Sequence, residues 1–335
     1  MTVNSKSTNL MWTSQVKLSV LSFHIQASVF SSGSRDGSKL LETEARIKGP
    51  LPYDDPDLLR FVRQDHLYPP SNLPYNLVQD HAKVQMEAKK YSGFVGEFGF
   101  MFYAHVLRNI FKGTREGFFV EAGALDGEFL SNTLPLERDL GWTGLLVESN
   151  GDTFKELLMK RRKAWASHSC LAAHEYPHGD ILVKFRRDHS AMDMYEDRSA
   201  SAHSMMMSQD RGATMDNSVP GHREYEAIQC IPLATLLLAI DVTHVDLVSL
   251  DIEGGEMGVL RYFPWDRITV DVWLVEHATG KDKFKNKGEN KYDSDFIKMF
   301  NDRGYELYSA NDDATINYVF VLRSSKVYSR LKETK

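Results

Sequence analysis

Cysteine is scarce in this chain of 335 residues, with only Cys170 and Cys230 present. Two cysteines are too few for the dense cross-linking that stabilises small secreted domains, so the sequence excludes a disulfide scaffold. A cytosolic domain and a lumenal domain without disulfides would have the same cysteine content. The chain also has no Asn-x-Ser/Thr sequon, which disfavours a glycosylated lumenal protein.

Long apolar runs are absent as well. The best candidate, residues 16–30, is interrupted by Ser, His and Gln and is too short to cross about 30 Å of hydrocarbon. It also lacks the continuous apolar core and the small-residue cleavage site of a signal peptide. We therefore expect no transmembrane helix, and a cytoplasmic protein.

Basic residues are not in excess either, because the formal net charge is −6 at pH 7. This balance argues against a nucleic acid or a membrane surface as a partner bound through bulk charge. A role for local basic clusters, such as residues 160–163, stays open. With 42% hydrophobic and 26% charged residues, the chain can form one large α/β domain with extensions.

Residues 117–150 are expected to form a strand, a loop, a helix and a second strand. The apolar run at 118–120 leads directly into residues 121–124 (EAGA), which is typical of a buried parallel strand that ends in a tight turn. Residues 143–147 are a second apolar strand, which ends on Glu148.

Between these two strands the sequence predicts a capped helix. Ser131, Asn132 and Thr133 offer N-cap oxygens, and Pro135 falls in the first turn, where its missing N–H costs nothing. Gly141 suits the C-cap, so the helix is expected to end there.

This arrangement predicts a site for a nucleotide-type cofactor. In a doubly wound sheet, a glycine-containing loop after the first strand lets the backbone approach the ligand, and an acidic residue after the second strand binds ribose hydroxyls. The glycine spacing is not G-x-G-x-x-G, and carboxylates such as Glu121 and Asp126 would repel a pyrophosphate. They suit the ammonium group and the sulfonium of S-adenosylmethionine, which has no phosphate. The expected cofactor-binding residues are Glu121, Gly123, Ala124, Asp126, Gly127, Ser131, Asn132, Glu148, Ser149 and Cys170.

A plainer interpretation of the same residues exists. Glu121 could only cap a helix, and Glu148 could be a solvated strand end. Ser169 and Cys170 would lie near the adenine if the fold is right, but Cys170 could equally be an ordinary buried thiol.

The quoted segments resemble a known family. Residues 117–148, followed by VDLVSLDIEGGEMGVL and VDVWLVEH, are similar to the FkbM-type methyltransferase domain, and especially to the animal branch that includes the Star-type membrane proteins. The likeness spans about residues 54–327, with gaps. It implies a Rossmann-like methyltransferase fold and, for the enzymatic members, transfer of a methyl group from S-adenosylmethionine to a hydroxyl oxygen. For the Star branch it implies a membrane anchor and trafficking in the secretory and endosomal pathway.

The fold class we predict is α/β, with a mostly parallel seven-stranded sheet, an antiparallel last strand and an N-terminal helical extension. Later strands are expected at 165–172, 228–238 (with a short helix), 245–252, 270–275, 305–308 and 316–322, and helices at 152–163, from 257, and at 293–302. The predicted parts are a loosely attached segment (1–51), a helical extension (52–116, with helices at 54–66 and 77–90 and an aromatic-rich insertion at 92–112), the methyltransferase domain (117–327), a flexible Met-rich insertion within it (188–223) and a tail (328–335).

The catalytic candidates lie at the ends of two neighbouring predicted strands. Ligands bind open α/β sheets at the carboxyl ends of the strands, where Asp251, Glu253, Glu276 and His277 are expected. Methyl transfer requires an in-line acceptor and removal of its proton. His277 has a suitable unperturbed pKa for the base, and Glu253 is the alternative if burial raises its pKa. Asp251 completes the predicted catalytic set.

Other roles for these residues stay open. Asp251 and Glu253 could cap the following helix, and His277 could be a satisfied strand-end histidine. Asp251, Glu253 and Glu276 could hold a magnesium ion, although carboxylates side by side do not require one. We predict no metal.

Two functions follow as hypotheses. The first is an S-adenosylmethionine-dependent O-methyltransferase that acts on a small molecule or a glycan. The second is a non-catalytic Star-like protein that binds protein cargo, with a location in the endoplasmic reticulum, the Golgi apparatus or late endosomes.

Overall fold

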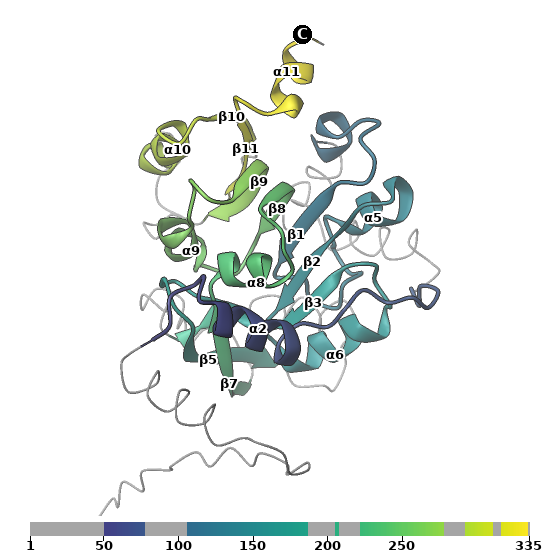
Figure 1. Cartoon of the computed structure of the whole chain (residues 1–335), viewed down its shortest axis with the longest axis vertical. Coiled ribbons are helices and arrows are strands. Elements are labelled where there is room, and N and C mark those ends of the chain that lie inside the picture. The colour runs from purple at the N-terminus through teal and green to yellow at the C-terminus, as the bar shows by residue number, and fades with distance from the viewer. Residues whose placement is uncertain are drawn as a thin grey trace, which may run out of the picture. The chain divides into compact units, whose positions relative to one another are not determined.

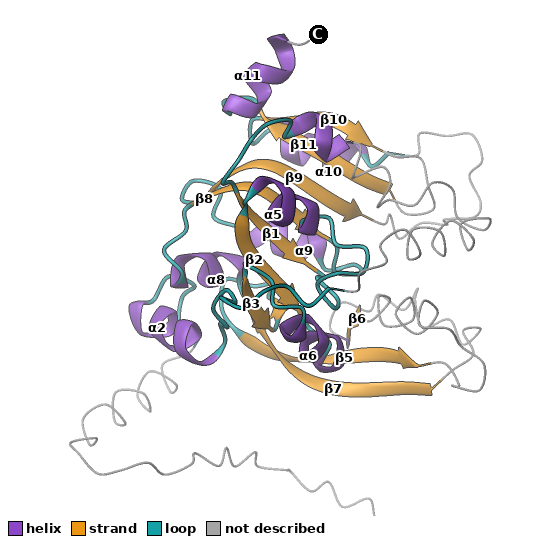
Figure 2. Ribbon diagram, turned by 90° about the vertical axis from the view of Figure 1, so that its right-hand side faces the viewer, coloured by secondary structure: helices purple, strands orange, loops and turns teal. Residues whose placement is uncertain are grey.

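The computed structural model describes residues 50–77, 106–186, 205–207, 222–277, 292–310 and 316–333, all within the unit Lys48–Lys335. A seven-stranded sheet forms its centre, in the order β10-β11-β9-β8-β1-β2-β3 (Figures 1 and 2). All neighbours pair in parallel except β11, which is antiparallel to both β9 and β10. The strands are β1 (Phe118–Ala122), β2 (Thr143–Glu148), β3 (Trp165–His168), β8 (His244–Leu250), β9 (Thr269–His277), β10 (Tyr305–Ala310) and β11 (Ile316–Leu322). The predicted fold class is confirmed.

Both faces of this sheet are covered, which explains why its central strands carry apolar residues on both sides. On β1, Val120 belongs to one buried cluster and Phe119 to another. The first cluster includes Trp273 and Phe300, and the second includes Trp142. A parallel sheet buried on both faces requires such continuous runs rather than an alternation of polar and apolar residues. The helices are α2 (Pro56–Asp65), α5 (Leu134–Leu140), α6 (Gly151–Met159), α8 (Leu233–Ala239), α9 (Glu256–Tyr262), α10 (Ser294–Asn301) and α11 (Lys326–Glu333).

The C-cap predicted at Gly141 is observed, whereas Thr133 at the N-cap of the same helix makes no side-chain capping hydrogen bond. Asp55 accepts the N–H groups of Asp57 and Leu58 at the start of α2, and Gly141 ends α5 with φ +72°. Helix α2 lies beside α8 in both views, and the Thr235 hydroxyl of α8 donates to the carbonyl of Tyr53, just before α2, at 2.8 Å. The N-terminal extension is therefore joined to the domain at this point.

A second sheet was not expected from the sequence. It has four strands in the order β4-β7-β5-β6: β4 (Cys170–Leu171), β5 (His178–Arg186), β6 (Met205–Met206) and β7 (His222–Ile231). Figure 2 shows β5 and β7 side by side as long antiparallel strands. The single strand predicted at 165–172 is wrong in this respect, since the chain leaves the large sheet after His168 and enters the second sheet at Cys170. The predicted Met-rich insertion contributes β6 and the start of β7, while residues 187–204 and 208–221 lie outside the described residues.

Other expectations fall at the edges of the described structure. The helix predicted at 77–90, most of the insertion at 92–112 and the segment 1–49 lie outside it. Residues 106–110 are helical, and Phe111 packs edge-on against Trp142. Helix α11 occupies much of the predicted tail, and Arg330 on it donates to the Thr114 hydroxyl at 2.9 Å. None of the helices in the described part of the chain has the length and hydrophobicity of a membrane span.

Candidate functional site

A cavity lies at the carboxyl ends of the central strands. Its walls come from the loops after β1, β2, β3 and β8 and from the second sheet. The lining residues are 121–125, 129–132, 147–149, 169–171, 206, 249 and 251–253. Eight of the ten predicted cofactor-binding residues therefore line one cavity: Glu121, Gly123, Ala124, Ser131, Asn132, Glu148, Ser149 and Cys170.

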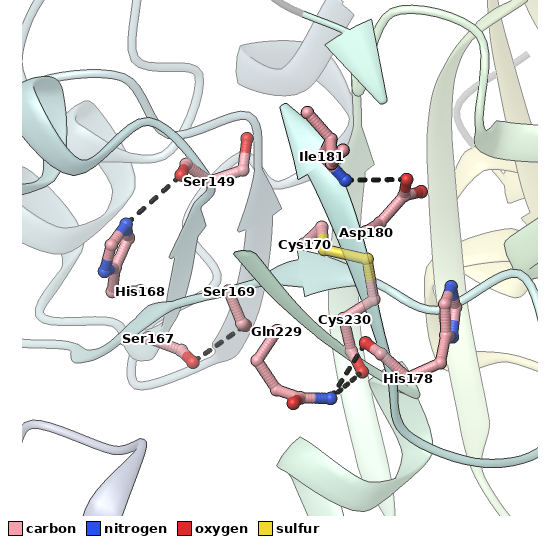
Figure 3. Close-up of a disulfide and its surroundings, with 10 residues drawn as sticks. All are labelled: Ser149, Ser167, His168, Ser169, Cys170, His178, Asp180, Ile181, Gln229 and Cys230. Carbon is pink, nitrogen blue, oxygen red and sulfur yellow. Dashed lines mark hydrogen bonds between the residues drawn. A yellow bond between two sulfur atoms is a disulfide. The ribbon is translucent and has the colours of Figure 1, made fainter. Parts of the chain in front are cut away.

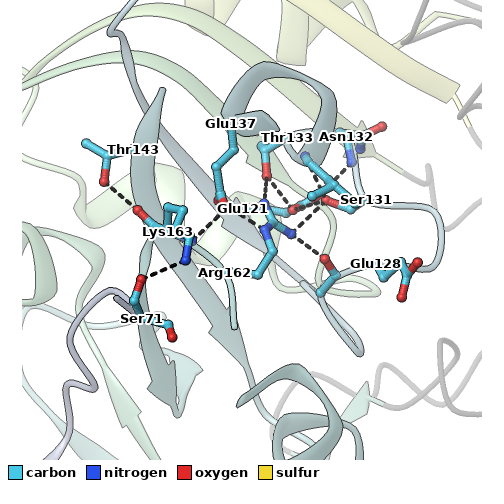
Figure 4. A network of polar contacts seen from close by, with 12 residues as sticks. Ser71, Glu121, Glu128, Ser131, Asn132, Thr133, Glu137, Thr143, Arg162 and Lys163 are labelled. Carbon is cyan, nitrogen blue, oxygen red and sulfur yellow. Dashed lines mark hydrogen bonds and ion pairs between the residues drawn. The ribbon is translucent and has the colours of Figure 1, made fainter. Parts of the chain in front are cut away.

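Glu121 at the end of β1 organises the loop that forms one wall. Its carboxylate accepts hydrogen bonds from the Ser131 hydroxyl at 2.8 Å, the Asn132 backbone N–H at 2.6 Å and the Thr133 hydroxyl at 2.6 Å (Figure 4). With 4% of its surface exposed, Glu121 is bound mainly to the protein itself. Its partners precede helix α5 directly, and this supports the interpretation that Glu121 caps a helix.

Arg162 lies behind the same loop and was not predicted to have a role. Its Nε donates to the Glu137 carboxylate at 3.0 Å, and its guanidinium also contacts the Gly127 carbonyl and the hydroxyls of Ser131 and Thr133. Figure 4 shows this side chain in the middle of the network. The basic run at 160–163 is therefore partly internal rather than a surface patch. A basic residue in a hydrophilic run gives no signal in the sequence that it is buried.

Asp126 and Gly127 were expected to bind the cofactor, but neither lines the cavity. One oxygen of Asp126 accepts the N–H groups of Glu128 at 2.9 Å and Phe129 at 2.7 Å, and the other lies 3.4 Å from the Lys160 ammonium group. The carboxylate thus stabilises the turn in the loop after β1. A short polar side chain in a turn often binds its own backbone in this way. A direct role of Asp126 and Gly127 in cofactor binding stays a prediction.

Gly123 brings two loops into direct contact. Its φ is +83°, and a Cβ at this position would lie 1.9 Å from the Asp251 carbonyl oxygen. The Asp251 N–H in turn donates to the carbonyl of Ala122 at 3.1 Å. The loop after β1 can therefore approach the loop after β8 only because residue 123 has no side chain.

Glu148 ends β2 inside the cavity. One carboxylate oxygen accepts the Leu125 N–H at 2.8 Å, and the other accepts the Asn150 N–H at 2.7 Å. Burial raises the pKa of this carboxyl to about 7, although these hydrogen bonds lower it. The Thr153 side chain and the Ser149 backbone also hydrogen-bond to it and lower its pKa, and the carboxylate still lines the cavity, where a ligand can reach it.

The rim opposite Glu148 is acidic. Asp251 and Glu253 line the cavity, and burial together with the neighbouring charges of Glu276 and Glu253 holds the pKa of Asp251 well above its usual range. The magnesium alternative gains no support: within the described ranges, the clusters spaced for a metal are His178–Asp180–Cys230 and His244–Asp246–Asp271. Cys230 of the first is in a disulfide. In the second, Asp271 faces His244 at 3.2 Å and Asp246 accepts the Phe118 N–H.

His277, predicted as the base, is not among the residues that line the cavity. Its Nε2 lies 3.1 Å from an Asp293 oxygen at the start of α10, and its ring stacks on Phe296 with centroids 4.2 Å apart. The position of His277 at a strand end could not show that its side chain packs on α10, because the direction of a side chain depends on what packs beside the strand. The interpretation of His277 as a satisfied strand-end histidine fits its surroundings better.

Cys170 and Cys230 form a disulfide, with Cα atoms 4.3 Å apart (Figure 3). The interpretation of Cys170 as a free thiol is therefore wrong. The bond joins β4 to β7, and its Cys170 end lines the cavity beside Met206. Sequence reasoning could not pair the cysteines, because the strands that bring them together belong to the unexpected second sheet.

Removal of this disulfide should weaken the fold. The bond closes a loop with a sequence separation of 60 residues, for which chain entropy gives about 4 kcal/mol. We expect Cys170→Ala/Cys230→Ala to lower the free energy of unfolding by about that amount in urea titrations. Reductant should destabilise the wild type similarly and leave the double variant unchanged. Equal sensitivity of both proteins to reductant would contradict the prediction.

Several lining residues were not predicted. Phe129, Leu130, Leu171 and Ile252 contribute apolar surface, and Ser249 accepts a hydrogen bond from the Asn132 side chain at 3.1 Å. Met206 reaches the cavity because β6 pairs with β5. No short-range pattern indicates such a contact.

The strand order, with a single antiparallel strand next to the edge and the cavity at the carboxyl ends, defines the Rossmann-like fold of S-adenosylmethionine-dependent methyltransferases. A family model described as the methyltransferase FkbM domain matches residues 121–307, more than half of the chain. The protein therefore belongs to the FkbM methyltransferase family.

Comparison with other proteins adds two solved structures. A TehB-like SAM-dependent methyltransferase from Corynebacterium glutamicum is 12% identical, with a TM-score of 0.30 over 72% of this chain and 98% of that chain. A SAM-dependent methyltransferase from Aquifex aeolicus is 7% identical, with a TM-score of 0.32 over 73% of this chain and 100% of that chain. No curated protein matches the sequence.

Proposed function

We propose that the protein uses S-adenosylmethionine to methylate a hydroxyl group of a small molecule or a glycan. The observation that carries the proposal is that three predicted parts of the site line one cavity. They are the glycine loop after β1, Glu148 at the end of β2, and Asp251 and Glu253 after β8. A cofactor with an amino-acid end, a ribose and a base needs polar groups from several strand ends in one place.

The residues present fit this cofactor. Asn132 lines the cavity, and its side-chain oxygen is buried with no hydrogen-bond partner among the described residues. A buried acceptor without a partner is unfavourable unless a ligand donates to it, and an ammonium group is a suitable donor. Glu148 would bind ribose hydroxyls, and Ser169 and Cys170 would lie near the adenine. When bound, S-adenosylmethionine supplies an electrophilic methyl group.

The acidic rim would bind the acceptor and remove its proton. In its ionised form, Asp251 or Glu253 would accept the proton of the acceptor hydroxyl when that oxygen takes over the methyl group and the methyl–sulfur bond breaks, which releases S-adenosylhomocysteine. The raised pKa of Asp251 makes this carboxylate a stronger base than an exposed aspartate. Since the rim is negative, it favours neutral or cationic acceptors over phosphorylated or carboxylated ones. His277 would act only through a change in the position of α10 or of its own side chain.

The Star-like alternative has one observation in its favour. Disulfides persist in oxidising compartments, so the Cys170–Cys230 bond favours the secretory pathway over the cytoplasm. We propose this location for the protein. It suits methylation of glycans as well as a non-catalytic role in the trafficking of protein cargo.

Calorimetric titration with S-adenosylmethionine and S-adenosylhomocysteine tests the proposal. Binding of both, followed by methyl transfer to a member of a panel of neutral hydroxylated metabolites and glycans, is the expected result. Absence of binding by the oxidised wild-type protein would overturn it. Binding without transfer to any panel member would favour the non-catalytic alternative.

The affinity for S-adenosylhomocysteine should depend on pH through Glu148. Its pKa of about 7 lies above the usual carboxyl value, so the group is mainly protonated below pH 7 and ionised above it. Because the ionised form is the better acceptor for ribose hydroxyls, we expect an affinity gain of about tenfold between pH 6 and pH 8. Titrations at several pH values measure it.

The matched control is Glu148→Gln, which keeps the shape of the side chain and cannot ionise. It should bind the ligand more weakly and with little dependence on pH. A pH dependence as large as that of the wild type would mean that another group controls binding.

A further inference from the structure

Glu256, the first residue of α9, lies directly behind the acidic rim. It is 2% exposed and does not line the cavity. Its Oε1 atom accepts the N–H of Ile252 at 3.1 Å and the N–H of Gly254 at 3.0 Å. One oxygen therefore holds the two amides on either side of Glu253.

The backbone at this point needs such support. Glu253 has φ +59°, a left-handed conformation that costs a residue with a side chain about 1 kcal/mol or more. Gly254 follows with φ +114°. Residues in such conformations persist where their surroundings fix them, and they are frequent at functional sites. Here the fixing group is a buried carboxylate that belongs to the next helix.

Glu256 also acts on the rim through its charge. The groups that face Asp251 are Glu276 on β9, Glu253 on the loop and Glu256 on α9, and all three disfavour its ionised form. Burial raises the pKa of Glu256 itself to about 7, and Glu276 adds to this effect. Removal of the Glu256 charge would make Asp251 easier to ionise.

We propose that Glu256 is a positioning residue for the methyl transfer, which holds Asp251 and Glu253 at the cavity rim through the Ile252 and Gly254 amides. This inference rests on the proposed function. Glu256 would contact neither the cofactor nor the acceptor. Its two effects, on the position of the rim carboxylates and on their charge, can be separated by experiment.

Two variants separate the contributions. Glu256→Gln retains an acceptor oxygen at the same reach and removes the charge. Glu256→Asp retains the charge and draws the oxygen back by one methylene group. Glu306→Gln serves as the control, since Glu306 lies on β10 and pairs with Tyr328 and Lys332. Each is examined by the pH profile of kcat/KM, by kcat and by hydrogen exchange of the Ile252 and Gly254 amides.

In Glu256→Gln we expect kcat at high pH within about threefold of wild type, and an acidic limb of the profile moved to lower pH, because one of the charges that disfavour ionised Asp251 is gone. In Glu256→Asp we expect an unmoved limb, a kcat lowered by up to about 100-fold by misplacement of the carboxylates, and faster exchange of both amides. Glu306→Gln should match the wild type.

The proposal is overturned if both variants keep wild-type profiles, kcat values and exchange rates. A Glu256→Gln protein with faster amide exchange would also overturn it. If the wild type transfers no methyl group, the proposed function fails. The exchange rates then still decide whether Glu256 holds the loop.

Discussion

Gly123→Ala is expected to abolish cofactor binding. A Cβ at this position would lie 1.9 Å from the Asp251 carbonyl oxygen, and the φ of +83° disfavours any side chain. The clashing atom is a backbone oxygen directly after the central strand β8. It cannot move unless Asp251 moves with it. We expect a loss of about 2–5 kcal/mol in stability, from the strained conformation and the overpacking together. The affinity for S-adenosylhomocysteine should fall below the limit of calorimetry.

Gly141→Ala is the matched control for this variant. Gly141 has a similar φ of +72°, and apart from its chain neighbours no atom in the described part of the protein lies within 4 Å of the position that a Cβ would occupy there. The free energy of unfolding of Gly141→Ala should therefore fall by only about 1 kcal/mol, because of the backbone conformation. Its affinity for S-adenosylhomocysteine should equal that of the wild type. Equal loss of affinity in both variants would show that strain, and not contact with Asp251, explains the effect.

The second large effect is expected for Arg162→Met. Arg162 and Glu137 form an ion pair at 3.0 Å with side chains 2% and 0% exposed. Loss of the cation would leave a buried carboxylate without its charge partner, which costs about 3–5 kcal/mol. The loop contacts at Gly127, Ser131 and Thr133 would disappear as well. Urea denaturation should show the loss, and ligand affinity should fall with it.

Two further variants identify the cause. Glu137→Gln keeps an acceptor for the Lys163 N–H, now bound at 2.6 Å, and removes the charge. The double variant Arg162→Met/Glu137→Gln should have a free energy of unfolding about 1–3 kcal/mol higher than that of Arg162→Met alone. Arg138→Met, which removes an exposed pair with Asp139, should cost less than about 1 kcal/mol. A double variant no more stable than Arg162→Met would contradict the explanation by an unpaired charge.

Local sequence signals were sufficient for much of the large sheet. The apolar run before Glu121, the C-cap at Gly141 and the hydrophobicity of β8 and β9 each depend on near neighbours in the chain. Parallel strands then place their carboxyl ends along one edge. This is why Gly123, Glu148, Asp251 and Glu253 could be assigned to one cavity before their positions were known.

Contacts between distant residues decided the rest. The second sheet, the Cys170–Cys230 bond and the approach of Met206 arise from pairings across segments that carry no local signal. The same holds for individual side chains. His277 packs on α10, whereas Arg162 and Glu256 lie beneath the loops they hold.

The sequence by itself therefore determined the order of the elements in the large sheet, the family resemblance and much of the polar part of the cavity wall, because these depend on periodicity, caps and strand ends. Only the tertiary structure decided which charged groups face the cavity and which support it from behind. The physical reason is that a carboxylate or guanidinium has the same local signature in both places. Its role depends on the partners that folding brings within hydrogen-bond distance.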